Sequence, residues 1–180
     1  VDEDRGIVYV STETAGPHFW GGERFGANLF ANSLIALDAS TGRRLWHYQI
    51  VHHDLWDLDL PCPPTLLTVT QNGRPIDAVA QGTKQGLLFV FDRVTGAPLW
   101  PIHERPIERS RLPESRTWPT QPFPEKPAPL MRQLYTSEDV SDISSDARAL
   151  TAERFARAGS FGAFPPPSLK ETILFPGPDG

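Results

Sequence analysis

Short apolar runs separated by polar turns fill the first hundred residues, and this pattern is typical of an antiparallel β protein. The runs are rich in Val, Ile, Leu, Phe and Thr, and they have the length of ordinary strands. Strands are predicted at residues 7–11, 33–37, 46–50, 65–70, 76–80 and 87–91. Asn72-Gly73 stands between two of these runs and indicates a tight hairpin turn.

One unit of this pattern occurs twice. Residues 36–46 (ALDASTGRRLW) recur as residues 90–100 (VFDRVTGAPLW), so that Asp, Thr-Gly, Leu and Trp repeat at a spacing of 54. In each copy an apolar run predicts a strand, Asp opens a turn by binding its downstream backbone, and Gly supplies a positive φ. Leu-Trp then begins the returning strand, where the indole can cover the gap to an adjacent unit. The repeat predicts consecutive four-stranded antiparallel units, such as propeller blades, with Trp46 and Trp100 in equivalent positions.

The second half of the chain is rich in proline. Thirteen of the 19 prolines follow residue 100, and residues 101–136 show no sustained period. Free disorder is one interpretation of such a composition. The segment also contains large apolar side chains, which favour an ordered irregular loop packed over another surface, with Trp118 and Phe123 at least partly buried.

Two short helices and a strand are predicted after this loop. Thr136 begins a sequence that resembles a capping box. Ser144 or Ser145 can cap a second helix that ends at Gly159. A strand is expected at residues 171–175.

Composition excludes several classes of protein. The net charge of −5 and the absence of a Lys/Arg run argue against a nucleic-acid partner. No window approaches the ~18 apolar residues that span a membrane. The single cysteine, Cys62, excludes an internal disulfide framework and a cysteine-based zinc site, and it is predicted to be a small residue in a Pro-rich turn. The first residue is Val1 and the chain stops abruptly at Gly180, so a fragment of a longer protein is expected.

The segment 52–61 (HHDLWDLDLP) carries three carboxylates, two imidazoles and an indole. Core strands avoid this density of ionisable groups because burying an unpaired charge is costly, whereas loops that carry chemistry collect them. His52 and His53 are expected to orient the loop, and Asp54 and Asp59 to form turns. Trp56 is expected to pack beside the site.

Several motifs, in this order along the chain, resemble the pyrroloquinoline quinone (PQQ) dependent dehydrogenases, and most of all the glucose dehydrogenase branch. They are residues 28–33 (NLFANS), the Thr-Gly-Trp turn, the segment 52–57, residues 84–86 (KQG), residues 120–124 (TQPFP) and residues 175–177 (FPG). The resemblance implies an all-β fold, a fragment of an eight-bladed β-propeller with roughly two to three blades. Residues 1–100 would hold blade strands, 101–170 the Pro-rich loop and short helices, and 171–180 the start of the next blade.

The resemblance also implies the roles of individual residues. Asp57 occupies the position of the general base, and Lys84 that of the basic residue that binds the quinone oxygens. Their side chains should converge near the propeller axis, with a gap of roughly 5–10 Å before ligands bind. Ca²⁺ is expected near Asp57, Glu13 and Thr14. Well-known members have an Asn ligand where this chain has Thr14, with Glu13 beside it as a source of a carboxylate.

The function implied is oxidation of a hydroxyl group of a sugar, polyol or alcohol, with PQQ and Ca²⁺ as cofactors. Electrons would pass to ubiquinone or cytochrome c, and the family places the enzyme in the periplasm. The fragment alone is expected to be inactive. Two alternatives stay open: a non-catalytic propeller scaffold, which fits the repeats equally well, and an inactive family member, which Thr14 motivates.

Overall fold

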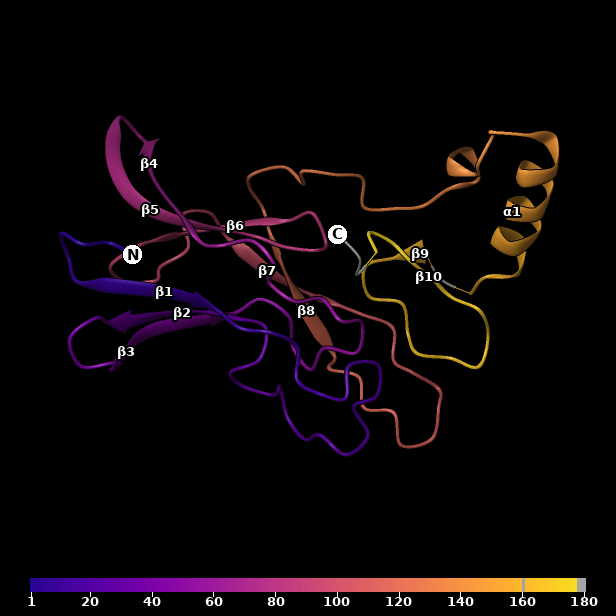
Figure 1. Cartoon of the computed structure of the whole chain (residues 1–180), viewed down its shortest axis with the longest axis horizontal. Coiled ribbons are helices and arrows are strands. Elements are labelled where there is room, and N and C mark those ends of the chain that lie inside the picture. Colours follow the sequence, from indigo (N-terminus) through magenta and orange to yellow (C-terminus); the bar gives the residue numbers. More distant parts are fainter. Residues whose placement is uncertain (160, 178–180) are drawn as a thin grey trace.

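Two antiparallel three-stranded sheets form the main body of the computed structural model, which describes residues 1–159 and 161–177. The first sheet contains β1 (Ile7–Ser11), β2 (Ser33–Asp38) and β3 (Arg44–Gln49), and the second contains β4 (Thr65–Gln71), β5 (Arg74–Gly82) and β6 (Leu88–Asp92). In both sheets each strand pairs with the next strand along the chain (Figure 1). The predicted antiparallel order is confirmed. The prediction of four strands in each sheet is wrong for the described residues, because each sheet has three.

The core lies where the two sheets meet. Alternate residues of β2 and β6 point inward, so that Leu34, Ala36, Phe89 and Phe91 have no exposed surface. Tyr48 of β3 packs against Phe91 with ring centroids 5.0 Å apart. The alternation of apolar residues that predicted the strands therefore also builds the interface between the sheets.

The repeated turns have the same structure in both copies. One oxygen of Asp38 accepts hydrogen bonds from the backbone N–H groups two and three residues downstream, at 3.0 and 2.9 Å. One oxygen of Asp92 does the same at 2.9 and 2.8 Å. Gly42 and Gly96 close the two turns with φ of 71° and 72°. The turn predicted from the repeat is confirmed.

Trp46 covers the turn of the neighbouring sheet, as predicted. Its indole Nε1 donates to the carbonyl of Arg93 at 3.2 Å. A Cβ atom added to Gly96 would lie only 2.6 Å from the Trp46 ring, so glycine is required there for close approach as well as for φ.

Trp100 does not occupy an equivalent position, which corrects the prediction. It packs on its own sheet, against a cluster that contains Ala78, Ala80 and Val90. The bridge between Phe91 and Pro98 begins the same strand pairing as in the first sheet, but the chain then leaves the sheet. Prolines 98 and 101 have no N–H group to donate to a strand ladder, which accounts for the missing strand.

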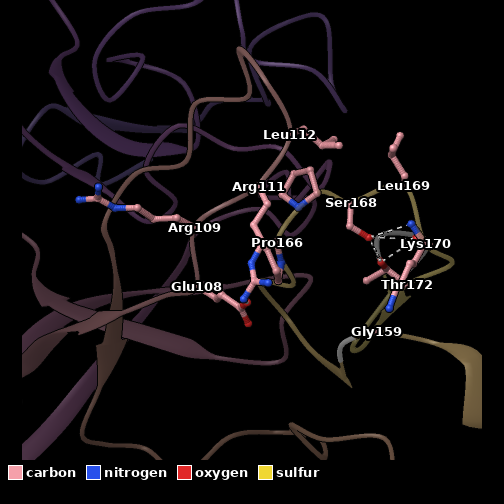
Figure 2. A pocket seen from close by; sticks show the side chains of 11 residues that line it. Glu108, Arg109, Arg111, Leu112, Gly159, Pro166, Ser168, Leu169, Lys170 and Thr172 are labelled. Atoms are coloured by element: carbon pink, nitrogen blue, oxygen red, sulfur yellow. Dashed lines mark hydrogen bonds and ion pairs between the residues drawn. The ribbon is translucent and has the colours of Figure 1, made fainter.

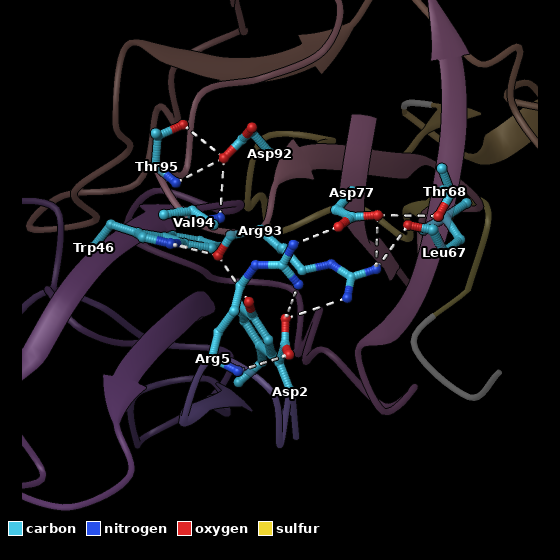
Figure 3. Close-up of polar contacts among 11 residues, drawn as sticks. Asp2, Arg5, Trp46, Leu67, Thr68, Asp77, Asp92, Arg93, Val94 and Thr95 are labelled. Atoms are coloured by element: carbon cyan, nitrogen blue, oxygen red, sulfur yellow. Dashed lines mark hydrogen bonds and ion pairs between the residues drawn. The ribbon is translucent and has the colours of Figure 1, made fainter. Parts of the chain in front are cut away.

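A cluster of four charged side chains joins the N-terminal segment to the second sheet (Figure 3). The side chain of Asp2 is almost fully buried and pairs with Arg5 at 3.0 Å and with Arg93 at 3.2 Å. Arg5 also pairs with Asp77 at 2.5 Å, and Arg93 donates to the carbonyl of Leu67 at 3.0 Å. Burial opposes the charged form of Asp2, but the bonds from Arg93 and Arg5 outweigh it and lower the pKa of that carboxyl.

The Pro-rich segment contains a hairpin, so the prediction of a wholly irregular loop is wrong. Strands β7 (Ile102–Pro106) and β8 (Thr120–Pro124) pair in antiparallel fashion as a separate two-stranded sheet. Prolines are tolerated because a strand of a two-stranded sheet needs a ladder partner on one side only. Trp118 and Phe123 are partly buried, as predicted. Trp118 packs against His52, and Phe123 against Phe164.

The predicted helices are present at one end of the molecule (Figure 1). Thr136 forms a capping box at the short helix η1 (Ser137–Asp139), and Ser144 caps α1 (Ser145–Arg157) through the N–H of Ala147 at 3.1 Å. Strands β9 (Phe161–Gly162) and β10 (Ile173–Leu174) are parallel, and β10 is shorter than the predicted strand 171–175. Of the predicted blade start 171–180, residues 178–180 lie outside the described residues. No helix in the described ranges is long and apolar enough to cross a membrane.

Candidate functional site

The loop that follows β3 is built around the buried carboxylate of Asp54. One oxygen accepts the N–H of Trp56 at 2.8 Å. The other accepts the N–H of Leu58 at 2.7 Å, the amide of Asn32 at 2.9 Å and the hydroxyl of Thr14. Asp54 therefore forms the predicted turn. Burial raises the pKa of Asp54, and the hydrogen bonds oppose that change.

This turn presents Asp57 to Lys84, which lies in the turn between β5 and β6. Asp57 has a left-handed backbone with φ of 59°, and its side chain is mostly buried. The Lys84 ammonium lies 3.5 Å from Asp57 Oδ2 and donates to the Asp57 carbonyl at 2.9 Å. The two residues converge as predicted, but the expected gap of roughly 5–10 Å is too large. Opposite charges that are both largely shielded from water attract strongly enough to close it.

Asp59 is not a local turn former, which corrects the prediction. One of its oxygens lies 3.0 Å from Lys84 Nζ, and the other accepts the N–H of Thr14 at 2.6 Å. Burial raises the pKa of Asp59, but the bonds from Thr14 and Lys84 outweigh it, so the net pKa is lowered. Burial likewise opposes the charge of Lys84, but Asp59 and Asp57 raise its pKa overall. Both groups are therefore held in their charged forms.

One oxygen of Asp57 makes no hydrogen bond with the described residues, although an imidazole nitrogen lies against it. Asp57 Oδ1 is buried and accepts no hydrogen bond from any described residue. The half-exposed ring of His18 places Nδ1 3.0 Å from this oxygen, outside hydrogen-bonding geometry. A carboxylate oxygen that accepts no hydrogen bond keeps a lone pair for a proton, and the half-exposed His18 ring is the group that a substrate hydroxyl would have to displace.

The predicted metal ligands do not form a complete metal site. Thr14 is buried beside Asp59, but its hydroxyl is engaged by Asp54, and the side chain of Glu13 is exposed. Lys84 places a positive charge beside Asp57, where a cation would have to bind. No group of three or more His, Cys, Asp or Glu side chains within residues 1–159 and 161–177 could hold a metal ion. These described residues do not fit a Ca²⁺ site by themselves.

Comparison with known proteins places this geometry in a family. Residues 1–180 match the family described as "PQQ: Glucose/ethanol/alcohol dehydrogenase, beta-propeller domain". The chain belongs to this family of quinoprotein dehydrogenases. The two three-stranded sheets are therefore parts of propeller blades, and the predicted fold class is confirmed.

Individual relatives agree with the match. The chain is 37% identical over 178 residues to the quinoprotein glucose dehydrogenase of Gluconobacter oxydans (strain 621H), covering 98% of this chain and 22% of that protein. It is 36% identical over 172 residues to the quinoprotein glucose dehydrogenase of Escherichia coli (strain K12), covering 95% of this chain and 22% of that protein. The crystal structure of quinohemoprotein alcohol dehydrogenase from Comamonas testosteroni superposes with a TM-score of 0.53 at 27% identity, over 68% of this chain and 18% of that one. The chain spans about a fifth of the length of the curated relatives it matches.

The two histidines of this quinoprotein segment orient the loop, as predicted. His52 lies between Gln49 and Glu104, at 2.8 and 3.1 Å. His53 donates from Nδ1 to the carbonyl of Gly26 at 2.8 Å, and burial lowers its pKa, which favours the neutral ring. Three of the four ring nitrogens therefore contact the backbone or neighbouring side chains, and Nε2 of His53 is buried without a hydrogen-bond partner among the described residues.

Two polar residues that support the loop were missed by sequence reasoning. Gln121 accepts from the N–H of His52 at 2.9 Å and donates to its carbonyl at 2.7 Å. Asn32 is fully buried, and besides Asp54 it binds the carbonyl of Leu58 at 3.0 Å. Gln121 lies in residues 120–124 and Asn32 in residues 28–33, two of the motifs that carried the family resemblance, where a polar residue among apolar ones was the available signal.

Trp56 packs beside the site, as predicted. It is 3% exposed, its Nε1 donates to the carbonyl of Pro165 at 2.7 Å, and its ring meets that of Phe164 edge-on. The C-terminal Pro-rich segment is thus fixed to the Asp54 turn. Cys62 lies in a bend among prolines 61, 63 and 64, as predicted, and its thiol is free and exposed.

Two cavities among the described residues are lined by neither Asp57 nor Lys84. The first, of about 430 Å³, opens between residues 108–112 and 166–172, with Arg111 and Lys170 among its lining residues (Figure 2). The second, of about 300 Å³, borders Leu55 and Trp56. The ion pair of the site lies outside both cavities.

Proposed function

We propose that the protein containing this chain oxidises a hydroxyl group of a sugar, polyol or alcohol with PQQ as its cofactor. The contact between Asp57 and Lys84 carries the proposal, together with an Asp57 oxygen that accepts no hydrogen bond from the described residues. Relatives named for glucose, quinate or shikimate, and glycerol support the substrate class. A mostly buried carboxylate beside a shielded ammonium is more typical of a catalytic site than of a non-catalytic scaffold.

Asp57 is proposed as the general base. Its Oδ1 accepts the hydroxyl proton of the substrate, while Lys84 remains near Oδ2. Because the backbone of Asp57 is fixed by the Asp54 turn and by Lys84, the carboxylate keeps its direction without cost at the moment of reaction.

Lys84 is proposed to bind the quinone. An ammonium group has three donors, and two are used at 2.9 and 3.0 Å, by the Asp57 carbonyl and by Asp59. The third faces Asp57 Oδ2 at 3.5 Å, too long for a strong bond, and can turn to a cofactor oxygen. PQQ, when bound, supplies the acceptor for the hydride that leaves the substrate carbon. Lys84 would stabilise the negative charge that develops on the quinone oxygen.

Three parts of the proposal are supported by family resemblance alone. They are electron transfer to ubiquinone or cytochrome c, a periplasmic location, and the binding of Ca²⁺. The proposal concerns the full-length protein, because the present chain spans about a fifth of the length of its relatives.

The test is reconstitution of the full-length protein with PQQ and Ca²⁺, followed by dye reduction with glucose, glycerol, quinate and ethanol. We expect PQQ-dependent turnover with at least one of them. Asp57→Asn should lower kcat by about 10²–10⁴-fold while the PQQ dissociation constant changes less than about threefold, because the base is lost but little volume changes. Asp38→Asn, in an exposed turn, is the matched control and should leave kcat unchanged. Absence of PQQ-dependent turnover with all four substrates, or near-normal turnover of Asp57→Asn, would contradict the proposal.

A further inference from the structure

Asp59 links two segments that meet at the site. It comes from the same loop as Asp57, and its two oxygens face different partners. Oδ2 pairs with Lys84 at 3.0 Å, and Oδ1 accepts the N–H of Thr14 at 2.6 Å. The side chain of Asp59 is 25% exposed and that of Lys84 12%, so the pair is shielded enough for its attraction to matter.

The two carboxylates next to Lys84 differ in their distance from the ammonium and in their role in the reaction. Asp57 is the more distant at 3.5 Å, and it is the one that must become neutral when it accepts a substrate proton. Asp59 makes the shorter contact, and no step of the proposed reaction protonates it. If Asp57 were the only anion near Lys84, the ammonium would lose its partner in each turnover, when its position matters most.

We propose that Asp59 is the residue that positions Lys84 for the cofactor, through the contact between Asp59 Oδ2 and Lys84 Nζ. This inference rests on the proposed function, because it assumes that Lys84 binds the quinone. Asp59 holds the ammonium away from Asp57 Oδ2 and keeps its charge balanced throughout the reaction. Its other oxygen anchors it to the backbone at Thr14, so that the carboxylate itself cannot swing.

Because the two oxygens of Asp59 have different partners, one substitution can remove the contact with Lys84 and keep the contact with Thr14. In Asp59→Asn the amide oxygen can still accept the N–H of Thr14, so the loop contact is kept. The amide nitrogen then faces Lys84 and cannot accept from it. Asp59→Glu retains the charge and is the rescue variant. Asp92→Asn, at the distant repeat turn, is the control for replacing a carboxylate with an amide.

The first measurement reports the position of Lys84 without turnover. Trace acetylation of the full-length apoprotein, read by peptide mass spectrometry, compares Lys84 with the exposed Lys126 and Lys170 as internal standards. Lys84 should be labelled several-fold faster in Asp59→Asn than in the wild type. The two standards, and Lys84 in Asp92→Asn, should be unchanged.

The second measurement is a double-mutant cycle in the PQQ-loaded enzyme. Asp59→Asn should lower kcat about tenfold, the size of one lost charge-assisted bond. The KM for the substrate should change less than about threefold, because Lys84 acts on the cofactor. In a Lys84→Ala background the same substitution should have almost no further effect. Asp59→Glu should recover most of the lost kcat.

The outcomes separate this inference from the proposed function. If Lys84→Ala leaves kcat intact, the role of Lys84 in the proposed function is wrong, and the inference falls with it. If Lys84→Ala lowers kcat but Asp59→Asn alters neither kcat nor acetylation, the function stands and the inference is overturned. An equal effect of Asp59→Asn with and without Lys84 also overturns it, since Asp59 would then act by another route. If Asp59→Asn does not fold, Asp59→Glu decides the question. Lys84 labelling and kcat near their wild-type values support the inference. Faster labelling of Lys84 together with a lower kcat opposes it.

Discussion

The carboxylate of Asp54 is the residue on which the geometry of the candidate site depends most directly. It uses both oxygens, one for the N–H of Trp56 and the other for three donors. An amide can replace only one of these oxygens as an acceptor. Asp54→Asn therefore forces one side of the turn to lose its bond.

The cost of that substitution can be worked out from the contacts. The amide oxygen will take the position with three donors, because the opposite orientation would leave three buried donors unpaired. The N–H of Trp56 then faces the amide nitrogen, and an unpaired buried donor costs about 1–3 kcal/mol. The remaining bonds lose their charge assistance, but the cost of burying a charge, which raises the pKa of Asp54, disappears as well. We expect a net local loss of about 2 kcal/mol.

Hydrogen exchange of the full-length protein measures this loss at the loop itself. A change of about 2 kcal/mol speeds exchange of the peptide over residues 54–60 by about 30-fold. Asp92→Asn is the matched control, because a single oxygen of Asp92 accepts all of its bonds and an amide can take over each of them. Its own turn should lose less than about 0.5 kcal/mol. Unchanged protection of residues 54–60 in Asp54→Asn, or equal effects at both turns, would refute the reasoning.

Two further predictions concern the repeat. Hydrogen bonds from Ser40 and Thr41 lower the pKa of Asp38 to about 2, so its contribution to stability is complete above the ordinary value near 4 and is lost as the pH falls toward 2. The thermal midpoint should accordingly fall more between pH 4 and pH 2 in the wild type than in Asp38→Asn, and parallel curves would contradict this. Gly96→Ala places a Cβ against the Trp46 ring in addition to the strain of a positive φ, and should cost about 2–4 kcal/mol by thermal or urea unfolding. Gly73→Ala has the same φ with open space around it and should cost about 1 kcal/mol, so equal losses would remove the Trp46 contact from the explanation.

The two carboxylates Asp54 and Asp59 show which part of the site the sequence could predict. Asp54 binds N–H groups two and four residues downstream, so the local rule that aspartate opens turns found its role. Asp59 binds Thr14 and Lys84, which are 45 and 25 residues away. Rules based on neighbouring residues cannot detect contacts over such separations in sequence, so the role of Asp59 is seen only in the folded structure.

The same limit explains the errors in the fold. Strands of the two main sheets were predicted because each is a short apolar run with alternating burial, which can be recognised without knowing its partner strand. The hairpin of β7 and β8 pairs Ile102 with Pro124 and includes prolines, which count against a strand in any local pattern. Trp100 repeats Trp46 in sequence, but two nearby prolines turn the chain out of the sheet before the equivalence is complete.

The charged cluster at the N-terminus has a consequence for the order in which the chain is made. Asp2 and its partner Arg93 are 91 residues apart, so at about 5–20 residues per second Asp2 is synthesised roughly 5–20 s before Arg93. During that interval Arg5, only three residues away, can already neutralise Asp2. Arg5 can thus pair with the Asp2 carboxylate, which lies just before the first sheet, until Arg93 has been made. Once Arg93 has been made, its contact with Asp2 joins the segment before the first sheet to the turn that follows the second, so the two sheets can be joined only after both have been synthesised.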